Sequence, residues 1–351
     1  MSAPTNIAEV ADIIRSSEKV LAVGAQTKPR LSQVPDDVTL VTMRNLSGIV
    51  DYDPGEFTFT ACAGTPLREI VATLAAQGQY LPFDPPLVET GATIGGTVAA
   101  GLSGPGRFRY GGLRDFILAV RFLDGNGTQL RGGAKVVKNA AGFDIPKFLV
   151  GSLGRFGVLT EVTFKVFPCP PAMMTFAIPC ANATEAVAHI AKAASGRWEF
   201  DALDFDGARI LARIRGPQNA LDSLAADIAR QWPGAAQIRN EVWNEIAEWK
   251  FASPGGVIAK VPLTLKSLPS LESAMSGTRF RFHVSGGGSF AYVYGLAGEC
   301  ADALRSALAG RNLPSMFLSG GESSPSQIPE NRPVIADAVK RAFDPLGRFS
   351  I

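Results

Sequence analysis

The stretch GATIGGTVAAGLSGPGRFRYGG, residues 91–112, constrains this chain more than any other part of its sequence. It holds eight glycines in 22 positions and is followed, three residues later, by the apolar segment FILAVRFL. Each glycine held in one conformation costs roughly 0.5–1 kcal/mol relative to alanine, so this density requires unusual backbone angles or the close approach of a ligand. Ile94, Val98 and Leu102 are interleaved with the glycines and can be buried, unlike the residues of a flexible linker.

The composition is that of an ordinary globular protein. A chain of 351 residues with 46% hydrophobic and 19% charged residues can bury a full core and should divide into two domains. Its 34 basic and 32 acidic residues are spread without blocks, so we expect no nucleic-acid partner and no basic arm for a membrane surface.

The location and the redox state follow from what the sequence lacks. There is no signal-peptide pattern at the N-terminus and no apolar run long enough to span a membrane, so we expect a cytoplasmic protein. The four cysteines have no CxxC spacing and there are only two histidines, which argues against a zinc or iron-sulfur site. We expect reduced core or surface thiols and no metal.

Strands and helices alternate in the first half of the chain. Apolar periodicity predicts a helix over 7–16, strands over 20–23, 38–43 and 57–61, a helix capped by Thr65 that runs to Gly78, a hairpin from 117 through the turn 124–127, and a strand over 158–168. Thr93 is predicted to cap a short helix over 94–100, with Gly101 just after its end. Pro168, Pro170 and Pro171 mark the domain boundary.

The second half has a different rhythm, which predicts an antiparallel sheet backed by helices. Helices are expected from 184, over 219–231, after 267, from 301 and over 333–343, and strands near 200–205, 209–215, 257–261, 280–284 and 290–294.

Two glycine-bearing loops, GAQTK at 24–28 and GATIGG at 91–96, are the main functional candidates. No P-loop, no dinucleotide-binding GxGxxG and no nucleophile elbow occurs. Backbone N–H groups in two such loops, together with the N-terminus of the helix at Thr93, can converge on one diphosphate.

A series of motifs then resembles a known family. The segments LPFDPP, GATIGGTVAAGLSG, RYGGLRDFILAVRFLDGNG, KNAAGFD and GSLGRFGVLTE, in this order, are similar to the vanillyl-alcohol-oxidase (PCMH) type of FAD-binding flavoprotein, and within it to the FAD-binding E subunits of bacterial glycolate oxidase. The likeness is strong over residues 18–170. It implies an α+β fold with a PCMH-type FAD-binding domain of two α+β subdomains at 1–170, a smaller α+β cap-like domain at 171–330, and a C-terminal helix and tail at 331–351.

The resemblance also implies a cofactor and its contacts. FAD would lie extended between the two subdomains. Matching positions are Gly24, Ala25, Gln26, Thr27 and Lys28 in the first pyrophosphate loop, Pro86, Gly91, Ala92, Thr93, Gly95, Gly96, Ala99 and Gly101 beside the pyrophosphate and flavin, and Gly157 and Val158 on the adenine side.

The chain departs from the family pattern in three places. Ala25 and Gln26 stand where the first loop usually carries glycines, which weakens the expectation of tight FAD binding. Neither loop contains a histidine, so the FAD would be noncovalent. The tail FDPLGRFSI lacks the Asn-Pro-Gly continuation that often closes the family's C-terminus.

Catalytic residues cannot be assigned from the sequence. Oxidation of a 2-hydroxy acid needs a base for the hydroxyl proton and a cation for the carboxylate. Arg107, Arg109 and Arg114 could supply the cation, but solvated or partner-facing roles suit them equally well. We expect His283 to be a strand residue held by core hydrogen bonds and His189 to lie on a helix surface, and Lys138, Asn139 and Asp144 to order the loop before a helix.

The leading hypothesis is therefore the FAD-binding subunit of a glycolate oxidase complex that converts glycolate to glyoxylate. By resemblance its partners would be a sister FAD subunit and an iron-sulfur subunit, which would place the chain in the cytoplasm or, through those partners, at the inner membrane. Two alternatives stay open: a noncatalytic scaffold with weakened flavin binding, and a self-sufficient FAD-dependent oxidase.

Overall fold

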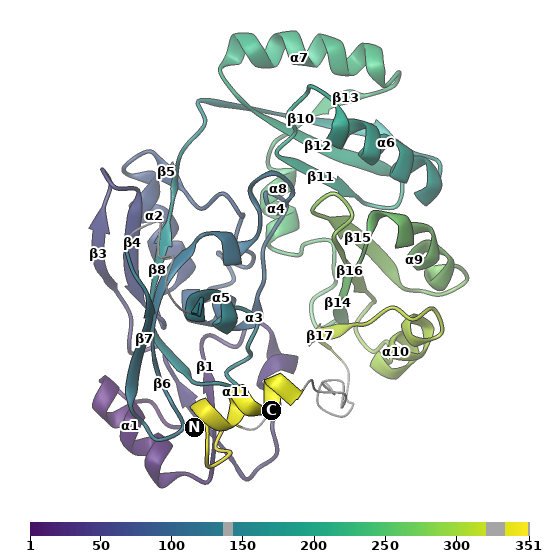
Figure 1. The fold of residues 1–351 in the computed structure, drawn as a ribbon. Helices are drawn as coiled ribbons and strands as arrows, with labels where there is room; N and C mark the ends of the chain where they lie inside the picture. The colour runs from purple at the N-terminus through teal and green to yellow at the C-terminus, as the bar shows by residue number, and fades with distance from the viewer. Residues whose placement is uncertain (136–142, 321–333, 350–351) are drawn as a thin grey trace. The chain divides into compact units, whose positions relative to one another are not determined.

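A computed structural model describes residues 1–135, 143–320 and 334–349 and divides the chain into two compact units (Figure 1). Unit 1 contains Met1–Leu102, Gly112–Cys169 and the described C-terminal residues. Unit 2 contains Ser103–Gly111 and the chain from Pro170 onward to residue 320. The chain leaves unit 1 between Cys169 and Pro170, within the run of prolines. The C-terminal helix belongs to unit 1 rather than forming a segment of its own.

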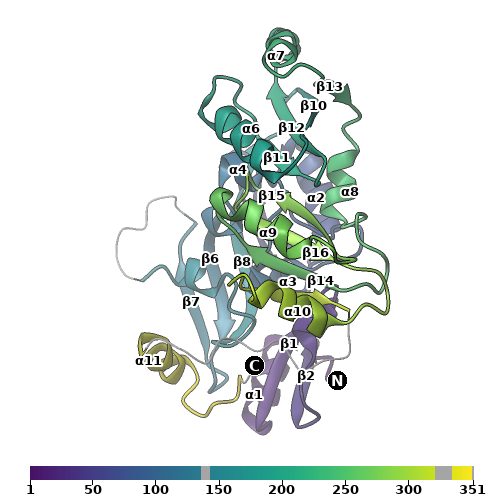
Figure 2. The same ribbon diagram turned by 90° about the vertical axis from the view of Figure 1, so that its right-hand side faces the viewer.

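The N-terminal part of unit 1 is one helix on a pair of parallel strands. Helix α1 (Ile7–Ser16) begins at Asn6, whose side chain accepts a hydrogen bond from the Glu9 N–H at 3.0 Å. Its buried face, which includes Val10 and Ile14, packs against β1 (Lys19–Val23) and β2 (Val38–Thr42) (Figure 2). The predicted boundaries of α1 and β1 are thereby confirmed to within one residue.

The second part of unit 1 is a five-stranded antiparallel sheet. In the order β3-β4-β8-β6-β7, the strands are Ile49–Asp53, Thr58–Cys62, Val158–Lys165, Ile117–Leu123 and Gln129–Gly133. The predicted hairpin joins β6 to β7, with Gly127 at φ +68° in its turn. The short strands β5 (Gln79–Tyr80) and β9 (Phe167–Pro168) form a separate pair.

Of the two helices α2 (Leu67–Ala75) and α3 (Ile94–Ala100), which precede β6, only α3 is capped by the predicted residue. Helix α3 starts at Thr93 and ends at Gly101, whose φ is +62°, as predicted. Helix α2 starts at Pro66, and Thr65 does not cap it. The Thr65 hydroxyl instead donates to the Cys62 carbonyl at 2.7 Å and accepts from the Gly48 N–H at 2.9 Å. The predicted cap at Thr65 was wrong because a nearby turn provides better-placed partners.

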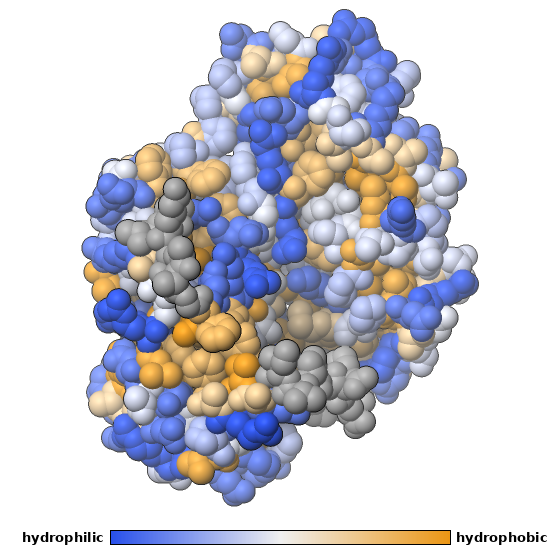
Figure 3. All heavy atoms as spheres, viewed as in Figure 1, coloured by the Kyte–Doolittle hydropathy of each residue, from blue (hydrophilic) through white to orange (hydrophobic). Residues whose placement is uncertain are grey.

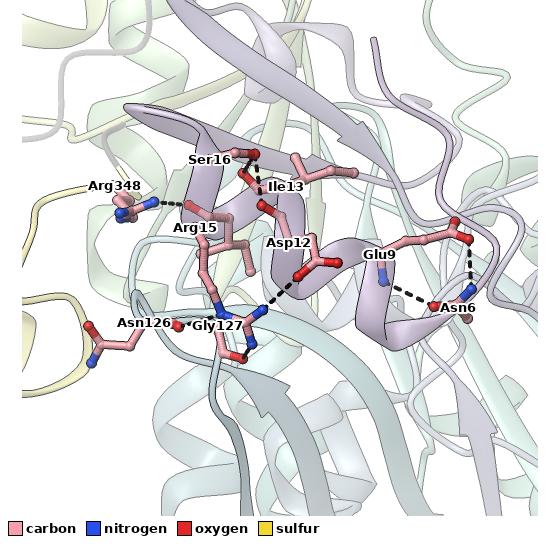
Figure 4. Close-up of polar contacts among 10 residues, drawn as sticks. Asn6, Glu9, Asp12, Ile13, Arg15, Ser16, Asn126, Gly127 and Arg348 are labelled. Carbon is pink, nitrogen blue, oxygen red and sulfur yellow. Dashed lines mark hydrogen bonds and ion pairs between the residues drawn. The ribbon is translucent and has the colours of Figure 1, made fainter.

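The C-terminus returns to the start of the chain. Arg348 donates to the Ile14 carbonyl at the end of α1, and Arg15 donates to the Gly127 carbonyl in the β6–β7 turn at 3.2 Å (Figure 4). Helix α11 (Val334–Phe343) brings Phe343 against Phe148 of α5 (Ile145–Leu149). Figure 3 shows apolar residues gathered around α5 and α11.

Unit 2 contains an eight-stranded antiparallel sheet backed by helices, as predicted (Figures 1 and 2). In the order β13-β10-β12-β11-β15-β16-β14-β17, the strands are Ala236–Ile238, Ala172–Pro179, Arg209–Gly216, Ala202–Phe205, Arg281–Ser285, Phe290–Tyr294, Ile258–Pro262 and Met316–Ser319. The helices are α4 (Arg107–Tyr110), α6 (Ala183–Ser195), α7 (Gln218–Gln231), α8 (Val242–Ala247), α9 (Leu268–Met275) and α10 (Ala301–Ala309). Alternate residues of the central strands join α6, α7, α9 and α10 in one large core.

The opposite face of this sheet is partly covered by α8 and the residues after it. Trp243 and Trp249 are both buried. Trp243 donates through Nε1 to the Thr175 hydroxyl at 2.8 Å, and Trp249 packs on the Tyr292 ring. Their spacing of six cannot place both on one face of one helix, but Trp249 lies after α8 with φ +53° and turns back to the sheet.

Candidate functional site

Two adjoining pockets in unit 1 lie between the end of β1 and helix α3. The first, which we call the loop pocket, is an open hollow of about 490 Å³ lined by residues 21–28, 31, 32, 93, 96, 99, 100 and 153. The second, the adjoining pocket, has about 410 Å³ and is lined by residues 22–24, 43, 63, 93, 95, 96, 99, 152, 154, 157 and 159. The predicted loops 24–28 and 91–96 thus meet at one place.

The predicted site residues divide into two groups. Ten of them line these pockets: Gly24, Ala25, Gln26, Thr27, Lys28, Thr93, Gly95, Gly96, Ala99 and Gly157. Five do not line either pocket: Pro86, Gly91, Ala92, Gly101 and Val158. Val158 is buried in the core beneath α1, and Gly101 ends α3 against the backbone of Gly151.

The loop 24–28 presents its backbone to the pocket. None of the peptide N–H groups of these five residues donates a hydrogen bond to another residue in the described part of the chain. Gln26 has φ +52°, a left-handed conformation that glycine usually supplies. The loop therefore keeps a glycine-like shape although glutamine has replaced the expected glycine.

Lys28 is the only titratable residue that lines the two pockets, as far as the described residues go. Its side chain is 7% exposed, and its ammonium donates to the neighbouring Thr27 hydroxyl at 2.9 Å. No described carboxylate pairs with it. Burial lowers the pKa of Lys28 from 10.5 to about 8. The pocket thus holds one buried positive charge and free peptide donors next to it.

Helix α3 does not present free amides to the pocket. The N–H groups of Ile94, Gly95 and Gly96 donate to the Thr65 carbonyl at 3.0 Å, the Ala63 carbonyl at 2.9 Å and the Thr93 hydroxyl at 3.3 Å. The expectation that amides of both loops converge on one ligand is therefore wrong for these three residues. Two of their N–H groups hold α3 to the residues just after β4 (Thr58–Cys62), and the third is used by the cap of the helix.

The glycines around the pockets are required for different structural reasons. A Cβ on Gly24 would lie 2.1 Å from the Thr93 hydroxyl, and one on Gly95 would lie 2.6 Å from the Ala63 Cβ. These two glycines are required by protein packing. Gly96 is half-buried and lines both pockets, and its only close neighbour would be the Thr93 hydroxyl at 3.0 Å. A side chain at Gly96 would therefore enter the pockets.

Sequence reasoning missed several lining residues on the loop after α5. Ser152, Leu153 and Gly154 lie in GSLGRFG, a motif of the family resemblance in which only Gly157 was assigned a role. Leu153 has φ +55°, and its N–H donates to the Ala99 carbonyl at 2.9 Å. This hydrogen bond joins the loop to the end of α3. The sequence around Leu153 contains no pattern that would predict it.

The remaining polar candidates have structural partners or are exposed. His283 is buried and bonded through Nε2 to Asp204 at 2.8 Å, which confirms its expected core role. Half-buried His189 lies on α6 beside Cys180 and Trp232. Arg107, Arg109 and Arg114 are exposed, and Arg109 pairs with Glu199 at 3.3 Å.

The residues expected to order the loop before a helix are only partly described. Asp144 accepts from the Lys147 N–H at 3.2 Å and caps α5, as expected. Lys138 and Asn139 lie outside the described residues.

The comparisons with known proteins agree with this geometry. A family model described as "FAD binding domain" matches residues 1–133. The chain is 35% identical over 255 residues to glycolate oxidase subunit GlcE of Escherichia coli (strain K12), covering 70% of this chain and 69% of that one. It belongs to the vanillyl-alcohol-oxidase (PCMH-type) family of FAD-binding flavoproteins.

Other relatives share mainly the first half of the chain. It is 30% identical to a D-lactate dehydrogenase of Anaerostipes hadrus over 43% of this chain and 31% of that one. It is 29% identical to glycolate oxidase subunit GlcD of Bacillus subtilis (strain 168) over 49% and 38%. The chain thus spans less than two fifths of the length of these two relatives.

The fold extends beyond the matched domain. The structure resembles that of an alkyldihydroxyacetonephosphate synthase with a TM-score of 0.73 at 17% identity, over 99% of this chain and 76% of the other. At this identity the likeness concerns the fold alone. Among the described helices none is both long and apolar enough to cross a membrane.

Proposed function

We propose that this chain is the FAD-binding subunit of a complex that oxidises a small 2-hydroxy acid, with glycolate to glyoxylate as the reaction. The observation that carries the proposal is the loop 24–28, which lines one open pocket and has unused peptide N–H groups and a buried lysine. Donors of this kind are what a diphosphate requires, so the residues present fit FAD.

The other residues would hold the cofactor by shape. Gly96 and Ala99 offer a wall without large side chains, and Gly157 lines the adjoining pocket. Pro86, Gly91, Ala92, Gly101 and Val158 line neither pocket, and their proposed contacts with FAD rest on the family resemblance.

The binding mode we propose is noncovalent. The residues that line the two pockets include no histidine, cysteine or tyrosine in the described part of the chain, so no side chain there can form a bond to the flavin. Polar contacts and exclusion of water would then provide the affinity.

The chemistry would be shared with other subunits. When bound, FAD supplies an acceptor for the two electrons of the alcohol. A general base must lie near the hydroxyl proton, yet no carboxylate or histidine lines either pocket in the residues described. The four cysteines are free, and no group of three or more metal-ligating side chains occurs among the described residues. We therefore propose a sister FAD subunit, an iron-sulfur subunit, and a cytoplasmic position peripheral to the inner membrane through these partners.

The cofactor can be tested on the purified chain. We expect flavin absorbance bands near roughly 375 and 450 nm, typical of bound flavin, after reconstitution with FAD. Acid treatment should release the flavin unchanged, since it is noncovalent. A chain that takes up no flavin would favour the scaffold alternative instead.

The position of the cofactor can be tested at Gly96. Gly96→Val should abolish flavin retention, because its side chain would fill the space shared by both pockets. Gly310→Ala in unit 2 is the matched control, since its added methyl would meet only ordinary contacts at 3.5 Å or more. Circular dichroism should show both variants folded. Normal flavin content in Gly96→Val would mean that FAD binds elsewhere.

The subunit role can be tested by activity. Copurification from native cells should yield further subunits, and glycolate should reduce a dye at full rate only with the complex. A lone chain that is bleached by glycolate and reoxidised by air would instead be the self-sufficient oxidase.

A further inference from the structure

Lys28 is a buried cation whose surroundings contain no negative charge. It is the last residue of the loop 24–28 and lines the loop pocket, and its ammonium has only the Thr27 hydroxyl as a described partner. The pocket walls come from β1, the turn Pro29–Ser32, α3 and the loop at Leu153. A buried charge without a counter-ion costs free energy. This cost indicates that Lys28 is positioned to contact an anionic ligand.

Among the described residues, three other charged side chains belong to these surrounding elements. Lys19, at the start of β1, pairs with Asp37 at 2.6 Å, and neither Lys19 nor Arg155 of the Leu153 loop lines the pocket. Arg30, in the turn Pro29–Ser32, is 2% exposed and donates to the Gln33 side chain at 2.7 Å. Arginine keeps its charge throughout the ordinary pH range, so it cannot titrate with a ligand. The pocket-lining residues of β1, α3 and the Leu153 loop carry no titratable side chain. Any proton exchanged by this pocket near neutral pH must therefore belong to Lys28.

We propose that the Lys28 ammonium is the counter-charge of the bound diphosphate, and that binding of FAD is coupled to uptake of a proton by this side chain. The inference rests on the proposed function and deepens it. The proposal adds one charged side chain to the unused peptide N–H groups of the loop 24–28 as partners of the diphosphate. It also explains how a loop with Ala25 and Gln26 in place of glycines can still hold an anion.

The direction of the coupling follows from burial and charge. Burial holds the pKa of Lys28 at about 8 without ligand, so part of the population is neutral above neutrality. Two negative charges within contact distance would raise this pKa again, so the complex binds the proton more tightly than the free chain does. FAD affinity should therefore be constant below about pH 7 and fall as the pH rises past 8.

The first experiment measures FAD dissociation constants on the full chain between pH 7 and 9 at constant ionic strength, from the change in flavin fluorescence. The wild type should bind about tenfold more weakly at pH 9 than at pH 7, as linkage to one group with this pKa requires. Lys28→Met should bind about tenfold to a hundredfold more weakly at pH 7, with no dependence on pH. Lys28→Arg should bind FAD tightly at both pH values.

Lys260 provides the matched control. It lies on β14 in unit 2, and burial followed by repulsion from Arg107 lowers its pKa to about 8 as well. Lys260→Met should leave the pH dependence of FAD binding intact. If Lys260→Met removes it and Lys28→Met does not, the assignment to Lys28 is overturned.

The second experiment counts protons by calorimetry in two buffers of different ionisation enthalpy. At pH 8 the wild type should take up about half a proton per FAD, and the same with ADP, which carries the diphosphate without the flavin. Riboflavin, which lacks the diphosphate, should cause no uptake. FAD binding without proton uptake and without pH dependence would reject the role of Lys28 and leave the proposed function standing. Absence of FAD binding by the wild type would reject both.

Discussion

Lys28 and Gln26 both make the flavin-free chain less stable than it could be. Gln26 holds a left-handed conformation that costs roughly 1 kcal/mol for a residue with a side chain. The lowering of the Lys28 pKa from 10.5 to about 8 corresponds to about 3 kcal/mol at neutral pH, at 1.36 kcal/mol per pKa unit. Costs of this size at two positions of one loop are typical of a site built around a ligand.

Replacing Lys28 should therefore stabilise the flavin-free protein. We expect Lys28→Met to raise the free energy of unfolding by about 1–3 kcal/mol at pH 7, measured by urea denaturation. The folded-state pKa lies below the unfolded value, so the cost of Lys28 is complete below about pH 8 and vanishes above 10.5. The gain from the substitution should thus shrink by about half at pH 9.5.

Lys19→Met is the control for this prediction. Lys19 lies on the neighbouring strand β1 and pairs at the surface with Asp37 at 2.6 Å, so its loss should not stabilise the chain. A Lys28→Met variant that unfolds more easily than the wild type at pH 7 would show that the lysine supports the fold.

At the scale of single elements, α3 shows that the sequence next to a helix can predict where the helix begins and ends. Thr93 before the helix and Gly101 after it are the usual residues at helix ends, and both act as the sequence predicts. The acceptors that bind the first amides of α3 are carbonyls of Ala63 and Thr65, about 30 positions earlier in the chain. A pattern read along one segment cannot show that these distant groups meet it.

The cap of α3 offers a test at this scale. Thr93→Ala should lower the free energy of unfolding by about 1 kcal/mol, because the Gly96 N–H loses its acceptor beneath the loop. Thr73→Ala in α2 is the control, since the exposed Thr73 hydroxyl only donates to the Glu69 carbonyl of its own helix. Equal stability of the two variants in urea would mean that the cap contributes nothing.

At the scale of the whole molecule, each unit has its own core and its own buried polar groups. In unit 2, Asp201 and Arg213 are both 1% exposed and pair at 2.8 Å, and Arg215 contacts the same carboxylate at 3.1 Å. Arg213 also lies over the Trp243 ring, with its guanidinium carbon 4.8 Å from the ring centroid. This network fills the part of the sheet that α8 covers.

Breaking the network should destabilise unit 2 strongly. Asp201→Asn leaves the buried Arg213 without its counter-charge, and we expect a loss of about 3–5 kcal/mol in the free energy of unfolding. Asp222→Ala on the exposed surface of α7 should change it by less than about 0.5 kcal/mol. The double variant Asp201→Asn with Arg213→Met should recover part of the loss. A loss below about 1 kcal/mol for Asp201→Asn would show that the pair is not needed.

The sequence by itself determined the class of the fold and most of its elements, because helix ends, hairpin turns and apolar periodicity are properties of neighbouring residues. It also indicated the loop 24–28 and the segment from Gly91 to Gly101 as the place of the site. Only the tertiary structure decided which glycine faces the pocket and which peptide N–H groups make no hydrogen bond within the described part of the protein. It also decided that Lys28 is buried. Burial and hydrogen-bond partners depend on segments far apart in the chain, so no local pattern contains them.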